Sequence, residues 1–390
     1  MYEKLISDEN IFEGIMHASR GKKDDFKVFE TWYFAGEYTK KYRKLIENFP
    51  VYKHKPIQIY DGISRKVRQI IVPSYKEQVV HHCLVNVLEP IIWKGLYEYS
   101  CGSIPDKGVH WGANYFKKCI KNDKENTKYC LKMDVRKFFD SIDHDVLKAR
   151  IEKTIKDKKF LHVLYQVIDI NDKGLPLGFY TSQWLANFFL SDLDHYIKEQ
   201  LHAKYYVRYM DDMVIFGHDK TELHEMRKAI DNYLHDLHLQ MKDNWQVFLF
   251  DDGEGHGRCL DFMGFKFYRN RTVLRKSIMI KACRKAKKIG KKEKPTVYDC
   301  RQIISYFGWL DWTNSYNLYA KRIESNVSFR YCRYRVSKYD RRMAEWEEKR
   351  NVYRVYQLFV NRGAPEIGRQ VLNEYNLRKK KRHHKKRRTK

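Results

Sequence analysis

The 390-residue sequence lacks any run of about 18 apolar residues, and nothing at its start resembles a signal peptide. These absences predict a chain with no membrane anchor, and we expect it to be cytoplasmic. Its eight cysteines are scattered, and no two of them have the C-x-x-C spacing of a zinc site or a redox motif. We therefore interpret them as reduced thiols, several of which pack as small hydrophobic groups.

Acidic residues are scarce relative to basic ones. Asp and Glu number 49 against 77 Lys and Arg, which gives a formal net charge of +28. The last thirteen residues contribute ten positive charges and no negative ones, so the residues before them still carry +18. Such a surplus predicts a polyanionic partner; nucleic acid is the usual one, and an anionic membrane is the alternative. A hydrophobic content of 43% with 15% aromatic residues indicates that the chain folds.

The pattern of apolar residues predicts an α+β order of elements, followed by a helical region from about residue 281. Helices are expected over the first fifty residues, from residue 76 up to Pro90, from about Asp143, over 181–201 and over 220–239. Strands are expected at 58–60 and 67–72 about an Asp61-Gly62 turn, at 129–133, on both sides of Met210-Asp211-Asp212, and in a hairpin that turns at Arg269-Asn270.

Two adjacent carboxylates, Asp211 and Asp212, lie between the apolar runs "YYVRY" and "MVIF". One interpretation is an ordinary hairpin tip, because Asp is a common turn residue. The other is a metal site, because burying two neighbouring charges is costly unless cations compensate them. Asp134 ends the apolar strand "YCLKM" and could join them. Three converging carboxylates could hold two Mg²⁺ ions (Mn²⁺ is an alternative) about 3.5–4 Å apart, which is the arrangement of nucleotidyl-transfer sites.

At these residues the sequence resembles a reverse transcriptase. "YMDD" (Tyr209 to Asp212) resembles motif C of that family, and "MDVRKFFDSI" (Met133 to Ile142) resembles motif A. "RKVRQIIVPSYKEQVV" is similar to the fingers motif, "GLPLGFYTSQ" stands at motif B, and "LDFMGFKF" is similar to the primer grip. The motifs follow the family's order, and the resemblance extends from about residue 55 to 280.

The resemblance implies a right-hand polymerase with fingers at 1–128, a palm with an antiparallel sheet at 129–280, a helical thumb at 281–376 and a disordered basic tail at 377–390. It implies an RNA-directed DNA polymerase whose metal ligands are Asp134, Asp211 and Asp212. The residues that would bind the incoming dNTP are Lys66, Arg68, Phe139, Leu177, Gly178 and Gln183, with Phe139 excluding ribonucleotides. Those that would contact primer and template RNA are Tyr209, Met210, Phe262, Met263 and Gly264.

Motif B suggests a subclass. Leu177 stands where most of the family has Gln, and Ser182-Gln183 replaces Ser-Pro. This LGxxxSQ pattern resembles the bacterial and phage reverse transcriptases of diversity-generating retroelements, which implies cDNA with errors at adenines, a structured RNA and a small accessory protein. Losing a positioning hydrogen bond could lower discrimination by about 1 kcal/mol. The alternative is that Leu177 is a packing variant.

Rival functions are a retron, antiphage-defence or group II intron reverse transcriptase, and a catalytically silent RNA-binding scaffold.

Several basic and aromatic residues are open to two interpretations. The position that aligns with the family's proton-donating Lys is Trp245, with Lys242 nearby, so the general acid is unassigned. Arg208 could touch nucleic acid or be an exposed hairpin residue. Lys66 and Arg68 alternate along a strand and so share one face, which suits a phosphate clamp. The aromatics between Lys281 and Asn376 could stack on bases or form the core of the thumb.

Overall fold

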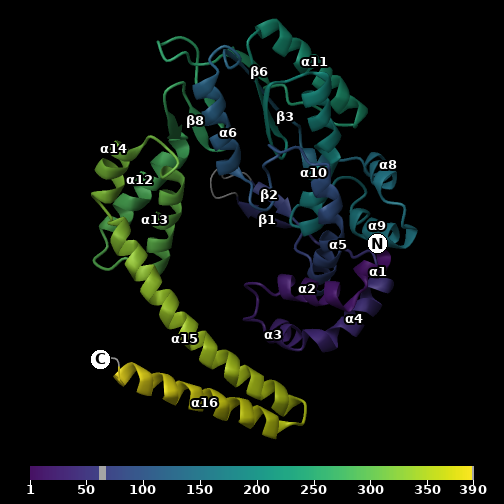
Figure 1. Ribbon diagram of the computed structural model, residues 1–390, viewed down its shortest axis with the longest axis vertical. Coiled ribbons are helices and arrows are strands. Elements are labelled where there is room, and N and C mark those ends of the chain that lie inside the picture. The colour runs from purple at the N-terminus through teal and green to yellow at the C-terminus, as the bar shows by residue number, and fades with distance from the viewer. Residues whose placement is uncertain (61–66, 389–390) are drawn as a thin grey trace. The chain divides into compact units, whose positions relative to one another are not determined.

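The computed structural model describes residues 1–60 and 67–388, and the chain divides into two compact units, Met1–Ile278 and Met279–Lys390 (Figure 1). The first unit mixes helices with antiparallel sheets and the second is helical, so the expected α+β class is confirmed. The predicted Asp61-Gly62 turn lies outside the described residues. No helix in the described part of the chain has the length and apolar character needed to cross a bilayer.

The first unit begins with short capped helices packed around a long one. Ser7 and Asp25 cap the second and third helices by accepting hydrogen bonds from backbone N–H groups in the first turn. The long helix starts at a capping box of Ser74 and Glu77. It continues through Pro90 instead of ending there, because Ile92 remains buried in the core. The elements are α1 (Tyr2–Leu5), α2 (Asp8–Ala18), α3 (Phe26–Tyr33), α4 (Ala35–Glu47), β1 (Ile57–Tyr60), β2 (Val67–Ile70) and α5 (Tyr75–Lys94).

A four-stranded antiparallel sheet, in the order β4-β5-β3-β6, forms the centre of this unit. Its strands are β3 (Tyr129–Asp134), β4 (Tyr205–Tyr209), β5 (Asp212–Gly217) and β6 (Gln246–Leu249). Side chains alternate between its faces. Met133 and Ile215 point into the main core, while Phe216 meets the aromatic ring of Phe116 on the other face. The sequence patterns did not predict β6, in which Val247 and Phe248 are partly buried and the two end residues are exposed.

Helices surround this sheet. α11 packs against β3, β5 and β6, and α6 packs against β4. Asp143 caps the helix that it was expected to start. The helices are α6 (Val109–Asn122), α7 (Phe138–Ser141), α8 (His144–Thr154), α9 (Lys158–Ile168), α10 (Tyr180–His195), its π-helical continuation η1 (Tyr196–Gln200) and α11 (Lys220–Asp236).

The expected second hairpin is a three-stranded sheet, because the chain turns twice. Its strands are β7 (Leu260–Phe262), β8 (Phe265–Phe267) and β9 (Thr272–Leu274). The turn about Arg269-Asn270 is present between β8 and β9. The sequence patterns did not predict the additional turn at Met263-Gly264, whose φ angles are positive, 50° and 85°.

The second unit contains α12 (Lys276–Gly290, which starts at the end of the first unit), α13 (Val297–Leu310), α14 (Tyr316–Tyr319), η2 (Ala320–Glu324), α15 (Phe329–Asn361) and α16 (Pro365–Arg388). Its buried core includes Ile303, Leu310 and Leu358. The half-buried rings of Phe307 and Phe329 stack beside it, 3.8 Å apart between centroids. Residues 377–388 continue helix α16 instead of forming the expected disordered tail. Lys and Arg are good helix formers, so the charge run extends a helix that starts at Pro365.

Candidate active site

A tight turn joins β4 to β5 and carries the adjacent carboxylates. Tyr209 pairs with Asp212, so Met210 and Asp211 are its two central residues. Met210 has a positive φ of 55°. This is the geometry of a type II′ turn, in which the first central position normally belongs to Gly. A non-glycine residue there costs about 1 kcal/mol or more, so neighbouring contacts must hold the backbone in place.

Arg208 supplies part of that support from directly behind the turn. Its side chain is fully buried, so both predicted interpretations of Arg208 as an exposed or nucleic-acid-contacting residue are wrong. Nη1 donates to the Met210 carbonyl at 3.0 Å and to Asn187 Oδ1 at 3.1 Å. Nε and Nη2 donate to the two oxygens of Asp194 at 2.7 and 2.6 Å. Ser100 and Tyr206 donate to the same carboxylate, which satisfies the buried pair.

Gly102 closes the other side of the turn. A Cβ at this position would lie 2.5 Å from Met210 Cγ and 2.7 Å from Met210 N. The segment that contains it is held beside β4, since Cys101 N donates to the Arg208 carbonyl at 2.8 Å. Asn187 of α10 reaches the same place and donates to the Gly102 carbonyl at 2.9 Å. Sequence patterns gave no sign of this support, because its members are far apart in the chain; Gly102 and Asn187, for example, are separated by 85 positions.

The third carboxylate comes from β3. The antiparallel register places Asp134 directly opposite Asp212, so their side chains are neighbours on the same face of the sheet. Burial, followed by the charges of Asp134 and Asp212, raises the pKa of Asp211 to about 7. Burial and the charge of Asp134 also raise the pKa of Asp212, against the lowering effect of Lys132, Lys242 and Arg275.

The surroundings of Asp134 suit a cation. One oxygen, Oδ2, accepts a hydrogen bond from Lys242 Nζ, and the other, Oδ1, is buried without a hydrogen-bond partner. Oxygen ligands of this kind are the ones that Mg²⁺ and Mn²⁺ prefer. The pairing of Lys242 N with the Asp134 carbonyl, at 2.8 Å, brings this lysine to the carboxylates. Trp245, which aligns with the family's proton-donating Lys, instead packs against His224 and Arg227.

The motif B segment lies between motif A and the strand that carries Arg68. Leu175 N donates to the Phe139 carbonyl at 2.7 Å, and Ile71 N donates to the Leu177 carbonyl at 2.8 Å. Gly178 has a φ of 109°, and a Cβ there would lie 2.3 Å from the Ile71 carbonyl oxygen. The segment therefore connects two of the predicted dNTP-binding motifs through backbone contacts.

A cavity of about 340 Å³ opens beside this segment. Two of the predicted nucleotide-binding residues, Gly178 and Gln183, line it, together with Lys22, Ile70, Ile71, Val72, Pro73, Gln78, His81, His82, Phe179 and Tyr180. Arg68 is exposed on β2, opposite Ile59. Lys66 lies outside the described residues. Phe139 is half-buried on α7, 5.5 Å from Phe138 between ring centroids.

The predicted primer-binding residues occupy different environments. Tyr209 is partly buried, and burial raises its pKa. Phe262 is buried, with its ring 5.9 Å from that of Phe116, so it belongs to the core. Met263 and Gly264 form the left-handed turn between β7 and β8. A Cβ at Gly112 would lie 3.0 Å from Met263 Cε, which places this turn against α6.

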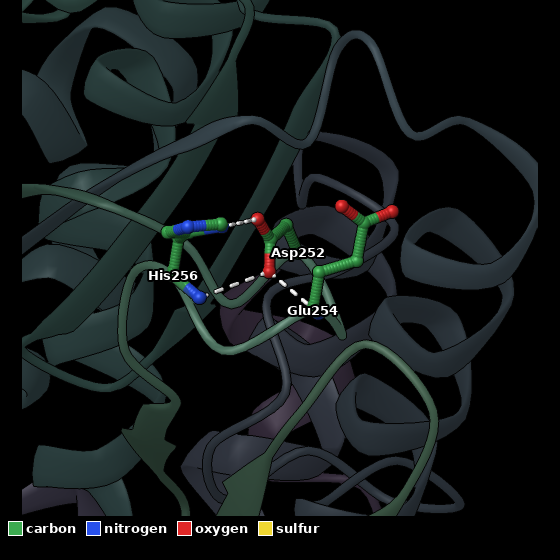
Figure 2. A group of neighbouring side chains, drawn as sticks. All are labelled: Asp252, Glu254 and His256. Carbon is green, nitrogen blue, oxygen red and sulfur yellow. Dashed lines mark hydrogen bonds and ion pairs between the residues drawn. The ribbon is translucent and has the colours of Figure 1, made fainter.

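A second acidic group lies in the loop after β6 (Figure 2). Asp252, Glu254 and His256 are close enough to hold an ion. However, Asp252 already accepts hydrogen bonds from the backbone N–H groups of Glu254 and His256, at 2.7 and 3.1 Å, and from His256 Nδ1 at 2.7 Å. These bonds close the turn, and Asp251 and Asp252 both lie in this loop.

Comparison with known proteins gives one family. Residues 52–267 match the model of the reverse transcriptase (RNA-dependent DNA polymerase) family. The retron Ec73 reverse transcriptase of Escherichia coli is 34% identical over 176 residues, which are 41% of this chain and 53% of that protein. The group II intron-encoded protein LtrA of Lactococcus lactis subsp. cremoris is 25% identical over 207 residues, 49% of this chain and 33% of that protein.

The chain thus spans about half or less of the length of these relatives. Among solved structures, telomerase from Candida tropicalis in complex with a TWJ fragment of telomeric RNA aligns with a TM-score of 0.46 and 13% identity, over 83% of this chain and 61% of that one.

Proposed function

Since the chain belongs to the reverse transcriptase family, we propose that it is an RNA-directed DNA polymerase that extends a primer 3′-end on an RNA template with dNTPs. The observation that carries this proposal is the meeting of Asp134, Asp211 and Asp212 at one end of the β3–β5 pair. A scaffold that only bound RNA would have no use for three neighbouring carboxylates that are costly to bury.

Asp134, Asp211 and Asp212 would hold two Mg²⁺ ions. When bound, the ions lower the pKa of the primer hydroxyl and stabilise the charge of the leaving pyrophosphate. Arg208 and Gly102 keep the Met210-Asp211 turn in place, which fixes the direction of the carboxylates. Lys242, which already donates to Asp134, is our candidate for the unassigned proton donor.

The dNTP would bind between the strand of Arg68 and the motif B segment. Arg68 and Lys66 would pair with the triphosphate, because guanidinium and ammonium groups bind phosphate oxygens strongly. Phe139 would press against the ribose position, and Leu177, Gly178 and Gln183 would shape the nucleotide pocket. In this assignment residues 1–128 are fingers, 129–280 palm and 281–376 thumb, and the basic end at 377–390 adds affinity for RNA.

The finer proposal is error-prone cDNA synthesis at adenines for a diversity-generating retroelement, with a small accessory protein as partner, in the cytoplasm of a bacterium. Its support is the LGxxxSQ sequence and the place of Leu177, whose carbonyl is bonded to Ile71 at the wall of the nucleotide pocket. A retron function is the second candidate. The 34% identity to the Ec73 enzyme favours it.

The test is primer extension on a defined RNA template with dNTPs and Mg²⁺, followed by sequencing of the cDNA. Wild type is compared with Asp211→Ala and with Asp252→Ala, which removes one carboxylate from the other Asp-Asp pair. We expect Asp211→Ala to abolish extension and Asp252→Ala to retain it. Extension by Asp211→Ala would refute the assigned site. Errors concentrated opposite adenine would support the retroelement function, and uniform accuracy would favour the retron.

A further inference from the structure

The second unit contains a cavity on the side of its longest helix. The cavity has a volume of about 960 Å³ and lies along α15, with one lining residue from α13. Its lining residues on α15 recur in the i, i+3, i+4, i+7 pattern of one helix face, so they form a single stripe along the helix. The stripe consists of Tyr331, Tyr334, Arg335, Lys338, Tyr339, Arg342, Met343 and Trp346. At 1.5 Å per residue it is about 22 Å long.

The four aromatic rings of this stripe are exposed. Tyr334 and Trp346 are 56% and 50% exposed, and Tyr331 and Tyr339 are each 39% exposed. A stripe at this spacing is normally the buried face of a helix. The buried core of the same unit is built from other residues, such as Ile303, Leu310 and Leu358. A row of large exposed rings indicates a binding surface.

Cations alternate with these rings. The guanidinium of Arg335 lies 5.9 Å from the Tyr331 ring centroid, and the ammonium of Lys338 lies 5.8 Å from that of Tyr334. Asp340 is paired with Arg301 of α13 at 2.5 Å. The remaining acids of α15 are Glu345, Glu347 and Glu348, and none of them lines the cavity.

The charge of the molecule is concentrated in this unit. Residues 279–390 contain 32 Lys and Arg against 10 Asp and Glu, a net charge of +22, which leaves +6 for residues 1–278. A second copy of the chain is therefore disfavoured as the occupant of the stripe, because like charges of this size repel. The partner that matches both features carries regular negative charge and flat aromatic rings whose faces can stack.

We propose that this stripe binds unpaired nucleotides of single-stranded RNA. The bases would stack on Tyr331, Tyr334, Tyr339 and Trp346, and Arg335, Lys338 and Arg342 would neutralise the phosphates between them. A duplex hides the faces of its bases, so the stripe prefers single strands. The proposal rests on the proposed function in one respect, because the RNA that reaches the stripe is an unpaired part of the template molecule. None of the stripe residues belongs to the candidate active site.

The test measures the affinity of the full-length protein for a labelled unstructured RNA, a blunt duplex of equal length and polyglutamate, over a range of salt concentrations. Tyr334→Leu keeps apolar bulk and removes the ring. Its matched control is Tyr316→Leu, an exposed tyrosine of the same unit outside the stripe. We expect Tyr334→Leu to weaken single-strand binding at least about fivefold, since one stacked base contributes roughly this much or more. We expect Tyr316→Leu to match wild type.

A second pair of substitutions separates stacking from charge. Arg335→Gln with Arg342→Gln removes two phosphate contacts, so the slope of log K against log salt should fall by about 1.4 for a single strand. Tyr334→Leu should leave that slope unchanged. Equal binding of duplex and single strand, with Tyr334→Leu equal to Tyr316→Leu, would overturn the proposal. Tighter binding of polyglutamate than of RNA, lost in Tyr334→Leu, would overturn it in favour of an acidic protein partner.

The proposed catalytic site and the proposed RNA-binding stripe can be tested independently of each other. Asp211→Ala should lose primer extension and keep single-strand binding, whereas Tyr334→Leu should keep extension on a short primed template. Thermal unfolding of each variant shows whether the fold is retained. If Asp211→Ala still extended primers, the assigned catalytic site would be wrong and the binding result would be unaffected.

Discussion

At the scale of single residues, the candidate site depends on the buried pair of Arg208 and Asp194 and on Gly102, which hold the turn that carries Asp211. Asp134, Asp211 and Asp212 were predictable because Asp134 ends an apolar strand and Asp211 and Asp212 lie between two apolar runs, and local patterns reveal such positions. Arg208, Asp194 and Gly102 were not, because their role arises from contacts across the fold. Arg208 directly precedes the YMDD motif on β4. Its burial nevertheless became visible only in the structure, where Asp194 of α10 lies beside it.

Substitution of Arg208 should weaken both the fold and the catalysis. Arg208→Lys keeps a positive charge near Asp194 but loses the paired hydrogen bonds and the bond to the Met210 carbonyl. We expect a loss of about 1–3 kcal/mol in the free energy of unfolding and about a tenfold lower extension rate. Urea unfolding would measure the loss of stability, and primer extension would measure the lower rate. Arg43→Lys, in the more exposed pair with Asp8, is the control and should change stability by less than about 1 kcal/mol.

Gly102→Ala should affect activity more than stability. The added Cβ would overlap Met210 and push the turn that carries Asp211. A displacement of about 1 Å in an active site can lower the rate about a hundredfold, so we expect kcat to fall by tenfold or more. The control is Gly36→Ala in α4, where a Cβ meets nothing within 4 Å. An unchanged kcat in Gly102→Ala would show that Met210 is not held by this contact.

At the scale of elements, local patterns predicted most helices but failed to predict where two of them end. α5 runs through Pro90 because its far side is still in the core, and helix α16 continues where charge density predicted disorder. The extra turn at Met263-Gly264 was missed because Met at a positive φ is rare, and only its contacts explain it.

The contact between α5 and α10 should make the fold sensitive to acid. His81, whose Nδ1 lies 3.0 Å from Thr181 Oγ1, is buried, and burial followed by the neighbouring His82 and His54 lowers its pKa to about 3. Burial, followed by the charges of His17, Lys22 and Arg20, lowers the pKa of His82 to about 4. The unfolded chain takes up protons near pH 6.5 and the folded chain does not, so stability falls as the pH drops from about 6.5 to 4.

Urea unfolding between pH 7.5 and 4.5 measures this effect. His82→Gln should flatten the decline relative to wild type, because one of the two depressed groups is removed. Comparison of the two proteins at each pH cancels the contribution of the carboxylates. An identical decline in both proteins would exclude His82 as a cause.

At the scale of the whole molecule, the sequence predicted the family and the order of its motifs, since both follow from short ordered segments. The stripe on α15 required the structure, because exposure of its rings depends on which helices cover them. Because most of the positive charge lies in residues 279–390, we expect the basic end to contribute to RNA binding and not to catalysis.

Removal of residues 378–390 takes away ten positive charges. We expect weaker RNA binding at low salt and a shallower dependence on salt concentration, because fewer phosphates are neutralised. The extension rate on a saturating short template should stay the same. Anisotropy titrations from low to high salt and primer extension measure the two effects. A lower saturated rate would assign the basic end a part in catalysis.

The uncovered middle of α15 has a consequence for amide hydrogen exchange. Cys332 near its start and Leu358 near its end are buried, but all residues from 337 to 349 except Met343 are exposed. Helices without tertiary cover are marginal in water, so these turns should exchange their amide hydrogens with solvent faster than either end. A strand of RNA laid along the stripe would supply the missing cover. Its arrival would then be recorded as slowed deuterium uptake in these central turns of the helix.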